Sequence, residues 1–249
     1  MRMVNSMEIE IKNTKIHYID YGKQDGNALV FLHGWGQNIE MMKPLADPFV
    51  KENRLIILDF PGFGESEEPK EVWTIEDFAD MVHELLTKLN VEHFTLLGHS
   101  FGGKVTLMYA SKYQVDKIVL FASPYRKEIS KTSVKTKILK GLKKVPGINN
   151  LEEFAKKHIG STDYKNASPM MRKILVEHVN LDLTETVKKI SCPALLIWGT
   201  KDAAVALEDA YKLESLMKDA AVIELEGGTH YAYLEFRGRV ISILRSFLS

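Results

Sequence analysis

The chain has 249 residues, 45% hydrophobic and 27% charged, which suits one large soluble domain, or a core with a substantial insertion. Lys plus Arg and Asp plus Glu both number 33, so the net charge of zero gives no general electrostatic argument for binding nucleic acid. Cys192 is the only cysteine, which excludes an internal disulfide and any metal site built on several thiolates.

The amino-terminal part of the chain predicts a hairpin, followed by alternating strands and helices. Residues 1–15 lack the apolar core of a secretion signal, and no apolar run reaches the roughly 18 residues of a membrane span, so we expect a cytoplasmic protein. Residues 7–22 alternate in hydrophobicity around a short turn, which predicts a β-hairpin. Further strands are predicted at 28–34, 54–60 and 93–97, and helices at about 39–50 and at 75–89, the latter capped by Thr74.

The carboxy-terminal part continues this alternation after one long interruption. A helix is predicted from about residue 101 to 113, and strands are predicted at 117–123, 194–199 and 221–227. Apolar strands that alternate with helices indicate an α/β fold with a mostly parallel sheet covered on both faces. Residues 124–193 show helical patterns without a convincing strand and exceed what a crossover needs. We therefore expect a core of residues 1–123 and 194–249 with 124–193 inserted as a helical cap, or lid.

Two helical patterns stand out in the expected cap. Residues 126–144 are rich in lysine, with apolar residues at helical spacing, which predicts a basic amphipathic helix. This helix could cover the site with its apolar face, attract an anionic substrate or touch anionic lipid, but without aromatic residues it is a poor membrane anchor. A second helix is expected within 160–179, with Ser168 as cap and Pro169 at its first position. Its Met and Leu residues would favour an apolar acyl or alkyl group.

Residues 98–102, Gly-His-Ser-Phe-Gly, carry the clearest chemical signal in the sequence. The pattern G-x-S-x-G between a strand and a helix predicts a sharp turn that exposes the hydroxyl of Ser100 as a nucleophile. Because serine is not ionised at neutral pH, it needs a base, and the base needs an orienting acid. His230 follows the last predicted strand and is the predicted base, and Asp202 follows the strand at 194–199 and is the predicted acid.

The loop after the strand at 28–34 is a candidate for binding an oxyanion. Gly34 and Gly36 allow its backbone to come close to a bound carbonyl group. We expect the backbone N–H groups of Trp35 and Phe101 to stabilise the charge of a tetrahedral intermediate. Structural roles are expected for other histidines, namely His17, His83, His99, His158 and His178.

Five motifs in order along the chain resemble those of the α/β-hydrolase family. They are LHGWG (32–36), DFPGFGES (59–66), GHSFGG (98–103), WGTKD (198–202) and GGTHY (227–231). The resemblance implies the α/β-hydrolase fold, a helical cap at 124–193, and the roles given above for the catalytic and oxyanion residues. A serine at position 100, where some relatives have aspartate, argues against haloalkane dehalogenase or epoxide hydrolase chemistry. The sequence departs from many relatives after Asp202, where AAVA replaces a proline-containing stretch, and in the tyrosines of HYAYLE, which could reshape the pocket.

These observations predict a serine esterase that cleaves small to medium carboxylic esters through an acyl-enzyme, with a small-molecule ester as its partner. We expect no metal, no organic cofactor, no nucleic acid and no stable membrane anchoring. Candidate pocket residues are Met170, Met171, Arg126 and Tyr231. The alternatives are a C–C bond hydrolase or lyase of the same fold acting on an anionic substrate, or a ligand-binding homologue with a vestigial site. Arg126 or Arg172 pointing into the pocket would favour an anionic substrate. The natural substrate and the oligomeric state stay open.

Overall fold

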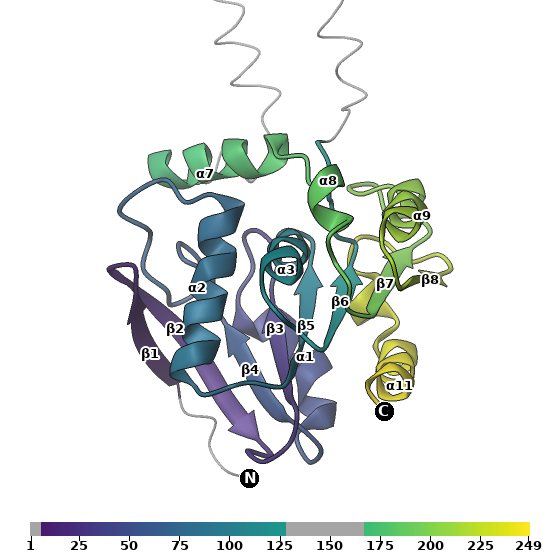
Figure 1. The fold of residues 1–249 in the computed structure, drawn as a ribbon, viewed down its shortest axis with the longest axis horizontal. Coiled ribbons are helices and arrows are strands. Elements are labelled where there is room, and N and C mark those ends of the chain that lie inside the picture. Colours follow the sequence, from purple (N-terminus) through teal and green to yellow (C-terminus); the bar gives the residue numbers. More distant parts are fainter. Residues whose placement is uncertain (1–5, 128–166) are drawn as a thin grey trace, which may run out of the picture.

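One twisted sheet of eight strands runs through the part of the chain that the structure describes (Figure 1). The computed structural model describes residues 6–127 and 167–249. In spatial order the strands are β1 (Ser6–Ile11), β2 (Thr14–Gly22), β4 (Arg54–Leu58), β3 (Ala28–Leu32), β5 (Phe94–His99), β6 (Lys117–Phe121), β7 (Ala194–Gly199) and β8 (Ala220–Leu225). The pairs β1–β2 and β2–β4 are antiparallel and all other neighbours are parallel, so the predicted mostly parallel sheet is confirmed.

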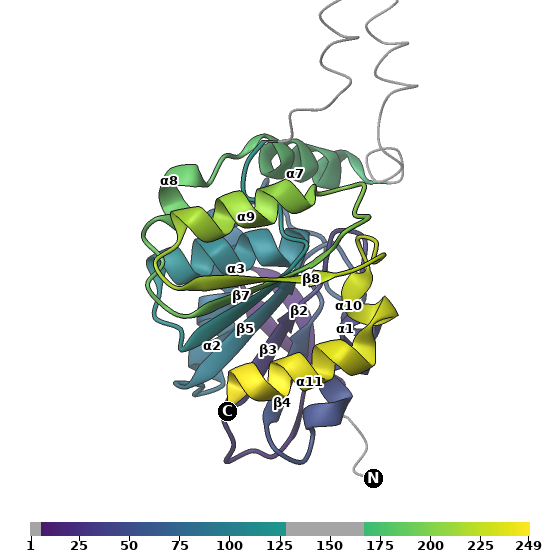
Figure 2. The ribbon, with the colours of Figure 1, turned by 90° about the vertical axis from the view of Figure 1, so that its right-hand side faces the viewer.

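Helices cover both faces of the sheet (Figure 2). One face carries α2 (Ile75–Lys88), α3 (Phe101–Lys112) and α9 (Leu207–Leu216), and the other carries α1 (Ile39–Ala46), α10 (Ala232–Glu235) and α11 (Arg237–Leu248). A short 3-10 helix at Asp47–Phe49 follows α1, and α8 (Thr184–Val187) precedes β7. α7 (Pro169–Asn180) lies across the end of the molecule toward which the arrows of β5 and β6 point (Figure 1). That end is where the loops after the parallel strands gather.

The alternation of side chains along the strands creates two separate apolar cores. In β3, Val30 and Leu32 pack into the core on the side of α2 and α3, whereas Leu29 and Phe31 pack into the core on the side of α1 and α11. All four are buried, which explains why the strand is apolar at every position. The sheet is therefore held from both faces, and its carboxyl ends form a rigid base for the loops.

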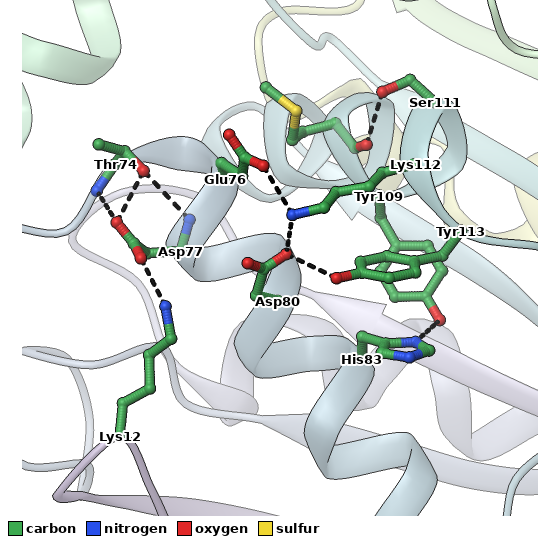
Figure 3. Close-up of polar contacts among 11 residues, drawn as sticks. Lys12, Thr74, Glu76, Asp77, Asp80, His83, Tyr109, Ser111, Lys112 and Tyr113 are labelled. Carbon is green, nitrogen blue, oxygen red and sulfur yellow. Dashed lines mark hydrogen bonds and ion pairs between the residues drawn. The ribbon is translucent and has the colours of Figure 1, made fainter.

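The helix that begins directly after Ser100, α3, is fixed to α2 by a polar network (Figure 3). The ammonium group of Lys112 lies 2.6 Å from carboxylate oxygens of both Glu76 and Asp80. The hydroxyl of Tyr113 donates to Asp80 at 2.8 Å, and its ring stacks on that of His83. The two carboxylates raise the pKa of Lys112. These contacts fix the carboxyl end of α3 to α2. The position of the first residues of α3, next to Ser100, is thereby tied to the core of the protein.

Most predicted elements appear within two or three residues of their expected bounds. Thr74 forms a capping box with Asp77 at the start of α2, and Ser168 caps α7 by accepting from the amide of Met171 at 3.1 Å. The helix expected from about residue 101, after the turn at 98–102, spans Phe101–Lys112, because the turn at Ser100 leads straight into it. The helices α8, α9, α10 and α11 were not individually predicted from the sequence.

The predicted cap is described only in part. Between β6 and β7, residues 122–127 and 167–193 contain α7 and α8 and no strand. The basic helix predicted within 126–144 lies outside the described residues, apart from its first two positions. Across 6–127 and 167–249, no helix is long and apolar enough to cross a membrane.

Candidate active site at the carboxyl end of the sheet

Ser100 occupies the sharp turn between β5 and α3. Its backbone has φ 50° and ψ −111°, a left-handed conformation that costs a non-glycine residue free energy. The amide of Ser100 donates to the carbonyl oxygen of Phe121 at 2.9 Å, which helps to hold the turn. Its side chain is half-buried, and no described residue forms a hydrogen bond with its hydroxyl. The predicted sharp turn between a strand and a helix is therefore present, and the role of Ser100 as a nucleophile stays a prediction.

Gly102 lets this turn lie against the end of β3. A Cβ atom at position 102 would lie 2.3 Å from the carbonyl oxygen of Leu32 and 2.6 Å from that of His33. Both neighbours are backbone atoms, so they cannot move aside easily. The first turn of α3, with the Phe101 amide, therefore lies close to the loop that carries Trp35.

Asp202 and His230 form a hydrogen-bonded pair. The Nδ1 atom of His230 lies 2.8 Å from Oδ2 of Asp202, whose side chain is completely buried. The other carboxylate oxygen accepts from the amides of Ala204 and Val205, at 2.8 and 2.9 Å. Because a carboxylate can only accept, Nδ1 of His230 donates, and its Nε2 is left with a lone pair. The acid thus fixes the histidine tautomer that a general base requires.

The loops that carry the acid and the histidine approach closely because position 199 is a glycine. A Cβ atom there would lie 2.2 Å from the carbonyl oxygen of Gly228. The same oxygen accepts from the amide of Lys201 at 2.8 Å, and the hydroxyl of Thr200 accepts from the amide of Gly227 at 2.8 Å. These contacts between the loops after β7 and β8 hold Asp202 beside His230.

Ser100 reaches the same edge of the sheet as this pair. The residue before it, His99, has its ring centroid 4.8 Å from that of His230, and its Nε2 atom lies 3.1 Å from the backbone oxygen of His230. The structure thus brings Asp202 and His230 into direct contact and places Ser100 next to a residue that touches His230. It shows no hydrogen bond between Ser100 and His230. Catalytic hydrogen bonds of this kind are often formed only once substrate is bound.

Trp35 and Phe101 lie side by side, with ring centroids 5.4 Å apart. Phe101 is the first residue of α3, so its amide has no acceptor within the helix. Within 6–127 and 167–249, no residue accepts a hydrogen bond from the amide of either Trp35 or Phe101. Both donors are therefore available to a bound oxygen, and their role in an oxyanion site stays a prediction.

The candidate pocket residues differ in their surroundings. Met171 is buried against the loop after β4, where a Cβ atom at Gly62 would lie 2.4 Å from its sulfur. Met170 is half-buried at the edge of the core. Tyr231 is 43% exposed, with its ring 5.6 Å from that of His230. Arg126 forms an ion pair with Asp209 on α9.

The contact of His178 with the oxyanion candidates was missed by the sequence analysis. Its ring stacks on that of Trp35 at 5.5 Å and meets the edge of Phe101 at 4.9 Å. Burial, with a smaller effect of the Lys104 ammonium, lowers its pKa to about 3. Its Nδ1 atom is buried and has no hydrogen-bond partner among the described residues. The helical spacing of 171, 174, 175 and 178 was the available signal, because these residues form the buried side of α7.

Lys104 fastens α7 to the core. It lies in α3 and is 1% exposed, and its ammonium group donates to the carbonyl oxygens of His178 at 2.7 Å and Leu181 at 2.8 Å. These carbonyls belong to the carboxyl end of α7, where a cation is favoured by the helix dipole. No sequence pattern marked this buried lysine as a link to the cap.

A second, structural Asp–His pair lies away from these residues. The Nδ1 atom of His17 is 2.7 Å from Oδ2 of Asp59, and its Nε2 atom is 2.7 Å from the hydroxyl of Ser6. Asp59 also accepts from the amides of Ile39 and Glu65. These groups border a cavity of about 400 Å³ that none of the predicted site residues lines. Asp59 thus joins β2, α1 and the loop after β4.

Comparison with known proteins finds similar hydrolases. Residues 27–132 match the family model described as the alpha/beta hydrolase fold. The chain is 24% identical over 98% of both chains to (E)-2-((N-methylformamido)methylene)succinate hydrolase of Acinetobacter baylyi. It is 25% identical to the pimeloyl-[acyl-carrier protein] methyl ester esterase of Aliivibrio fischeri, over 90% of this chain and 95% of the esterase.

The fold is shared with solved structures as well. A thermophilic esterase from Thermogutta terrifontis superposes with a TM-score of 0.76 at 21% identity, over 98% of both chains. Bromoperoxidase from Bacillus anthracis superposes with a TM-score of 0.79 at 23% identity, over 98% of both chains. Among the residues described here, no group of three or more His, Cys, Asp or Glu is arranged to hold a metal ion. With its sheet order and these likenesses, the chain has the α/β-hydrolase fold, and it is similar to hydrolases and esterases of that fold.

Proposed function

We propose that this hydrolase cleaves small to medium carboxylic esters through an acyl-enzyme formed on Ser100. The observation that carries the proposal is the buried Asp202 carboxylate holding His230 at 2.8 Å, at the same sheet edge as the strained turn of Ser100. A histidine oriented by a carboxylate, at the same sheet edge as a serine whose hydroxyl has no hydrogen-bond partner among the described residues, supports acyl transfer.

In this mechanism the Ser100 oxygen attacks the ester carbonyl carbon while Nε2 of His230 takes the hydroxyl proton. His230 then returns that proton to the leaving alcohol, and the acyl group remains on Ser100. A water molecule, deprotonated by the same nitrogen, attacks the acyl-enzyme and releases the carboxylic acid and the free serine. Asp202 keeps the ring oriented and stabilises its positive charge during both steps, because its second oxygen is itself held by two backbone amides.

The amides of Trp35 and Phe101 are proposed to bind the oxyanion. Both are without an acceptor among the described residues, and their side chains pack together, so the two N–H groups are held in a fixed relation. Because the donors are backbone groups, side-chain substitutions at these positions would change the shape of the pocket more than the charge stabilisation.

The surroundings favour a substrate without a charged acyl group. Met171 and Ile174 form part of the buried side of α7, which lies over this end of the sheet. Arg126, which would favour an anionic substrate if it faced the pocket, is instead paired with Asp209. Two similar proteins are named as esterases, one for a methyl ester and one thermophilic, which supports an ester as the substrate, whereas a third is named as the hydrolase of a succinate derivative.

The proposal is tested by the hydrolysis of p-nitrophenyl esters, from acetate to dodecanoate, by wild type and Ser100→Ala. We expect turnover with a chain-length optimum in wild type, and a fall in kcat of about 10³-fold or more in the variant. Ser111→Ala is the matched control, because Ser111 lies in the same helix and only bonds the carbonyl oxygen of Met108. Turnover by Ser100→Ala equal to wild type would contradict the mechanism.

A further inference from the structure

His99 lies between the two loops to which the proposed reaction assigns catalytic groups. It is the last residue of β5, directly before Ser100, and its side chain is completely buried. On one side its ring packs against the ring of His230. On the other side it faces the loop that carries Trp35. A side chain in this position can set the distance between the two loops.

Both ring nitrogens of His99 make polar contacts, one with each loop. Nε2 lies 3.1 Å from the backbone oxygen of His230, and Nδ1 lies 3.2 Å from Oε1 of Gln37. The same Gln37 oxygen accepts from the amide of Gly34 at 2.9 Å, directly before Trp35. A Cβ atom at position 34 would lie 2.8 Å from Nδ1 of His99, so only glycine fits this close approach. His99 therefore contacts the loop of His230 on one side and the loop of Gly34 on the other.

The protonation state of His99 follows from these contacts. Burial, reinforced by the nearby His230, lowers the pKa of His99 to about 3, so the ring is neutral at neutral pH and carries one proton. The backbone oxygen of His230 can only accept, so the proton lies on Nε2. Nδ1 then carries the lone pair and faces Oε1 of Gln37, which already accepts from the amide of Gly34, so this second contact is one of packing and not a hydrogen bond. The carboxamide of Gln37 lies between the ring and Gly34.

We propose that His99 is a positioning residue for the reaction proposed above. It donates a hydrogen bond to the backbone oxygen of His230 and packs against Gln37 and Gly34 in the loop of Trp35, and so holds the base and one oxyanion donor in register with Ser100. It does not itself touch substrate or move a proton. This inference rests on the proposed function, since it assigns His99 a role only if Ser100 and His230 carry the chemistry.

The test compares His99→Phe with His99→Gln. Phenylalanine keeps an aromatic ring in the ring cluster and removes both polar contacts, whereas glutamine keeps one donor and one acceptor. His83→Phe is the matched control, because His83 stacks on Tyr113 on the far side of α3 and touches neither loop. Thermal unfolding followed by circular dichroism confirms that each variant is folded. The readouts are kcat and KM for the best p-nitrophenyl ester, and the rate at which a fluorophosphonate labels Ser100.

We expect His99→Phe to lower kcat by about 10- to 100-fold with KM changed less than about 3-fold, because a displacement of about 1 Å in a catalytic group has an effect of this size. His99→Gln should recover part of the loss, and His83→Phe should stay within about 2-fold of wild type. If His99→Phe does not fold, Gln37→Met, which removes only the link to Gly34, should lower kcat with KM preserved. The double variant His99→Phe/Gln37→Met should have a kcat only a little below that of the more impaired single variant, because the two side chains act as one unit.

Unchanged kcat and labelling in a folded His99→Phe protein would overturn the positioning role, and so would equal losses in His99→Phe and His99→Gln. The failure of the proposed function gives a different result. In that case Ser100→Ala retains turnover, whatever substitution is made at position 99.

Discussion

At the scale of single residues, the arrangement of Asp202 explains why it serves His230 better than a surface aspartate could. One oxygen bonds the ring and the other is held by two amides, so the carboxylate cannot turn away. His99 and His178 show a second principle. Both are buried beside the proposed catalytic groups and have pKa values lowered to about 3, so they contribute shape and neutral hydrogen-bonding groups rather than charge.

Asp202→Asn should leave the protein folded and reduce kcat by roughly 10³- to 10⁴-fold. The carboxamide has one oxygen instead of two, so it cannot serve both the ring and the amides of Ala204 and Val205, and His230 loses the tautomer that a base requires. Asp116→Asn is the control, because Asp116 pairs only with the exposed His93. Steady-state ester hydrolysis measures the effect, and a loss of less than about 10-fold would contradict the orienting role of Asp202.

At the scale of elements, α7 is joined to the core by a buried cation as well as by apolar packing. Lys104 donates to two carbonyl oxygens at the carboxyl end of the helix, and His178 rests on Trp35 and Phe101. The position of α7 is therefore coupled to α3, which begins directly after Ser100, and to the loop of Trp35. A displacement of α7 would therefore shift α3 or the loop of Trp35, and with them the proposed site.

Lys104→Met should loosen the carboxyl end of α7. The two carbonyl oxygens would keep their buried surroundings without a donor, which costs roughly 2 kcal/mol or more. Hydrogen exchange should then become faster in residues 174–181 than in wild type. In Lys112→Met, the control, the lost contacts lie between α2 and α3, and exchange in α7 should stay as in wild type. Unchanged protection of α7 in Lys104→Met would show that apolar packing alone holds the helix.

Asp59→Ala should lower the free energy of unfolding by about 3 kcal/mol or more. Its carboxylate accepts from two backbone amides and from His17, and removal leaves these buried donors without an acceptor. Urea unfolding measures the change. Asp25→Ala, an exposed turn position, provides the comparison and should stay within about 0.5 kcal/mol of wild type. A similarly small change in Asp59→Ala would disprove the structural role.

At the scale of the whole molecule, the pH dependence of stability should be set by buried neutral histidines. Burial lowers the pKa of His33 to about 4 and those of His99 and His178 to about 3, whereas an unfolded histidine titrates near 6.5. Between about pH 6.5 and 4 the unfolded chain binds more protons. The free energy of unfolding should therefore decrease as the pH is lowered through this range, by up to about 1.4 kcal/mol per pH unit for each histidine.

Urea unfolding at pH 7, 6 and 5 measures this dependence. His178→Phe should reduce the slope of unfolding free energy against pH by up to about 1.4 kcal/mol per pH unit, because Phe cannot take up the proton that His178 gains on unfolding. His93→Phe should leave the slope as it is, since the His93 side chain is 72% exposed. Equal slopes in wild type and His178→Phe would show that His178 does not contribute to the loss of stability in acid.

The sequence predicted the sheet well because its strands are buried on both faces. β3 is apolar at every position, β5 is buried throughout, and the glycine-rich turn after β5 has few other structural explanations. α9 and α11 were not assigned, since each buries only two residues and has no side-chain cap to mark where it starts. Local patterns are informative only where burial or capping is strong.

The candidate site was predictable to the extent that its residues lie in short motifs. Ser100, Asp202 and His230 each follow a strand, and parallel strands bring their carboxyl ends to one edge. The contacts of His99 with His230 and of Lys104 with α7 depend on side-chain packing between distant segments. A single sequence holds no local signal for such contacts, so they required the structure.

The central claim is that His230 activates Ser100 as a nucleophile. The most direct test is to treat wild type and His230→Asn with a fluorophosphonate and to locate the adduct by peptide mass spectrometry. We predict one adduct in wild type, on Ser100, and labelling slowed by at least about 10²-fold in His230→Asn. Labelling of another residue in wild type, or equally fast labelling of Ser100 in both proteins, would contradict the account.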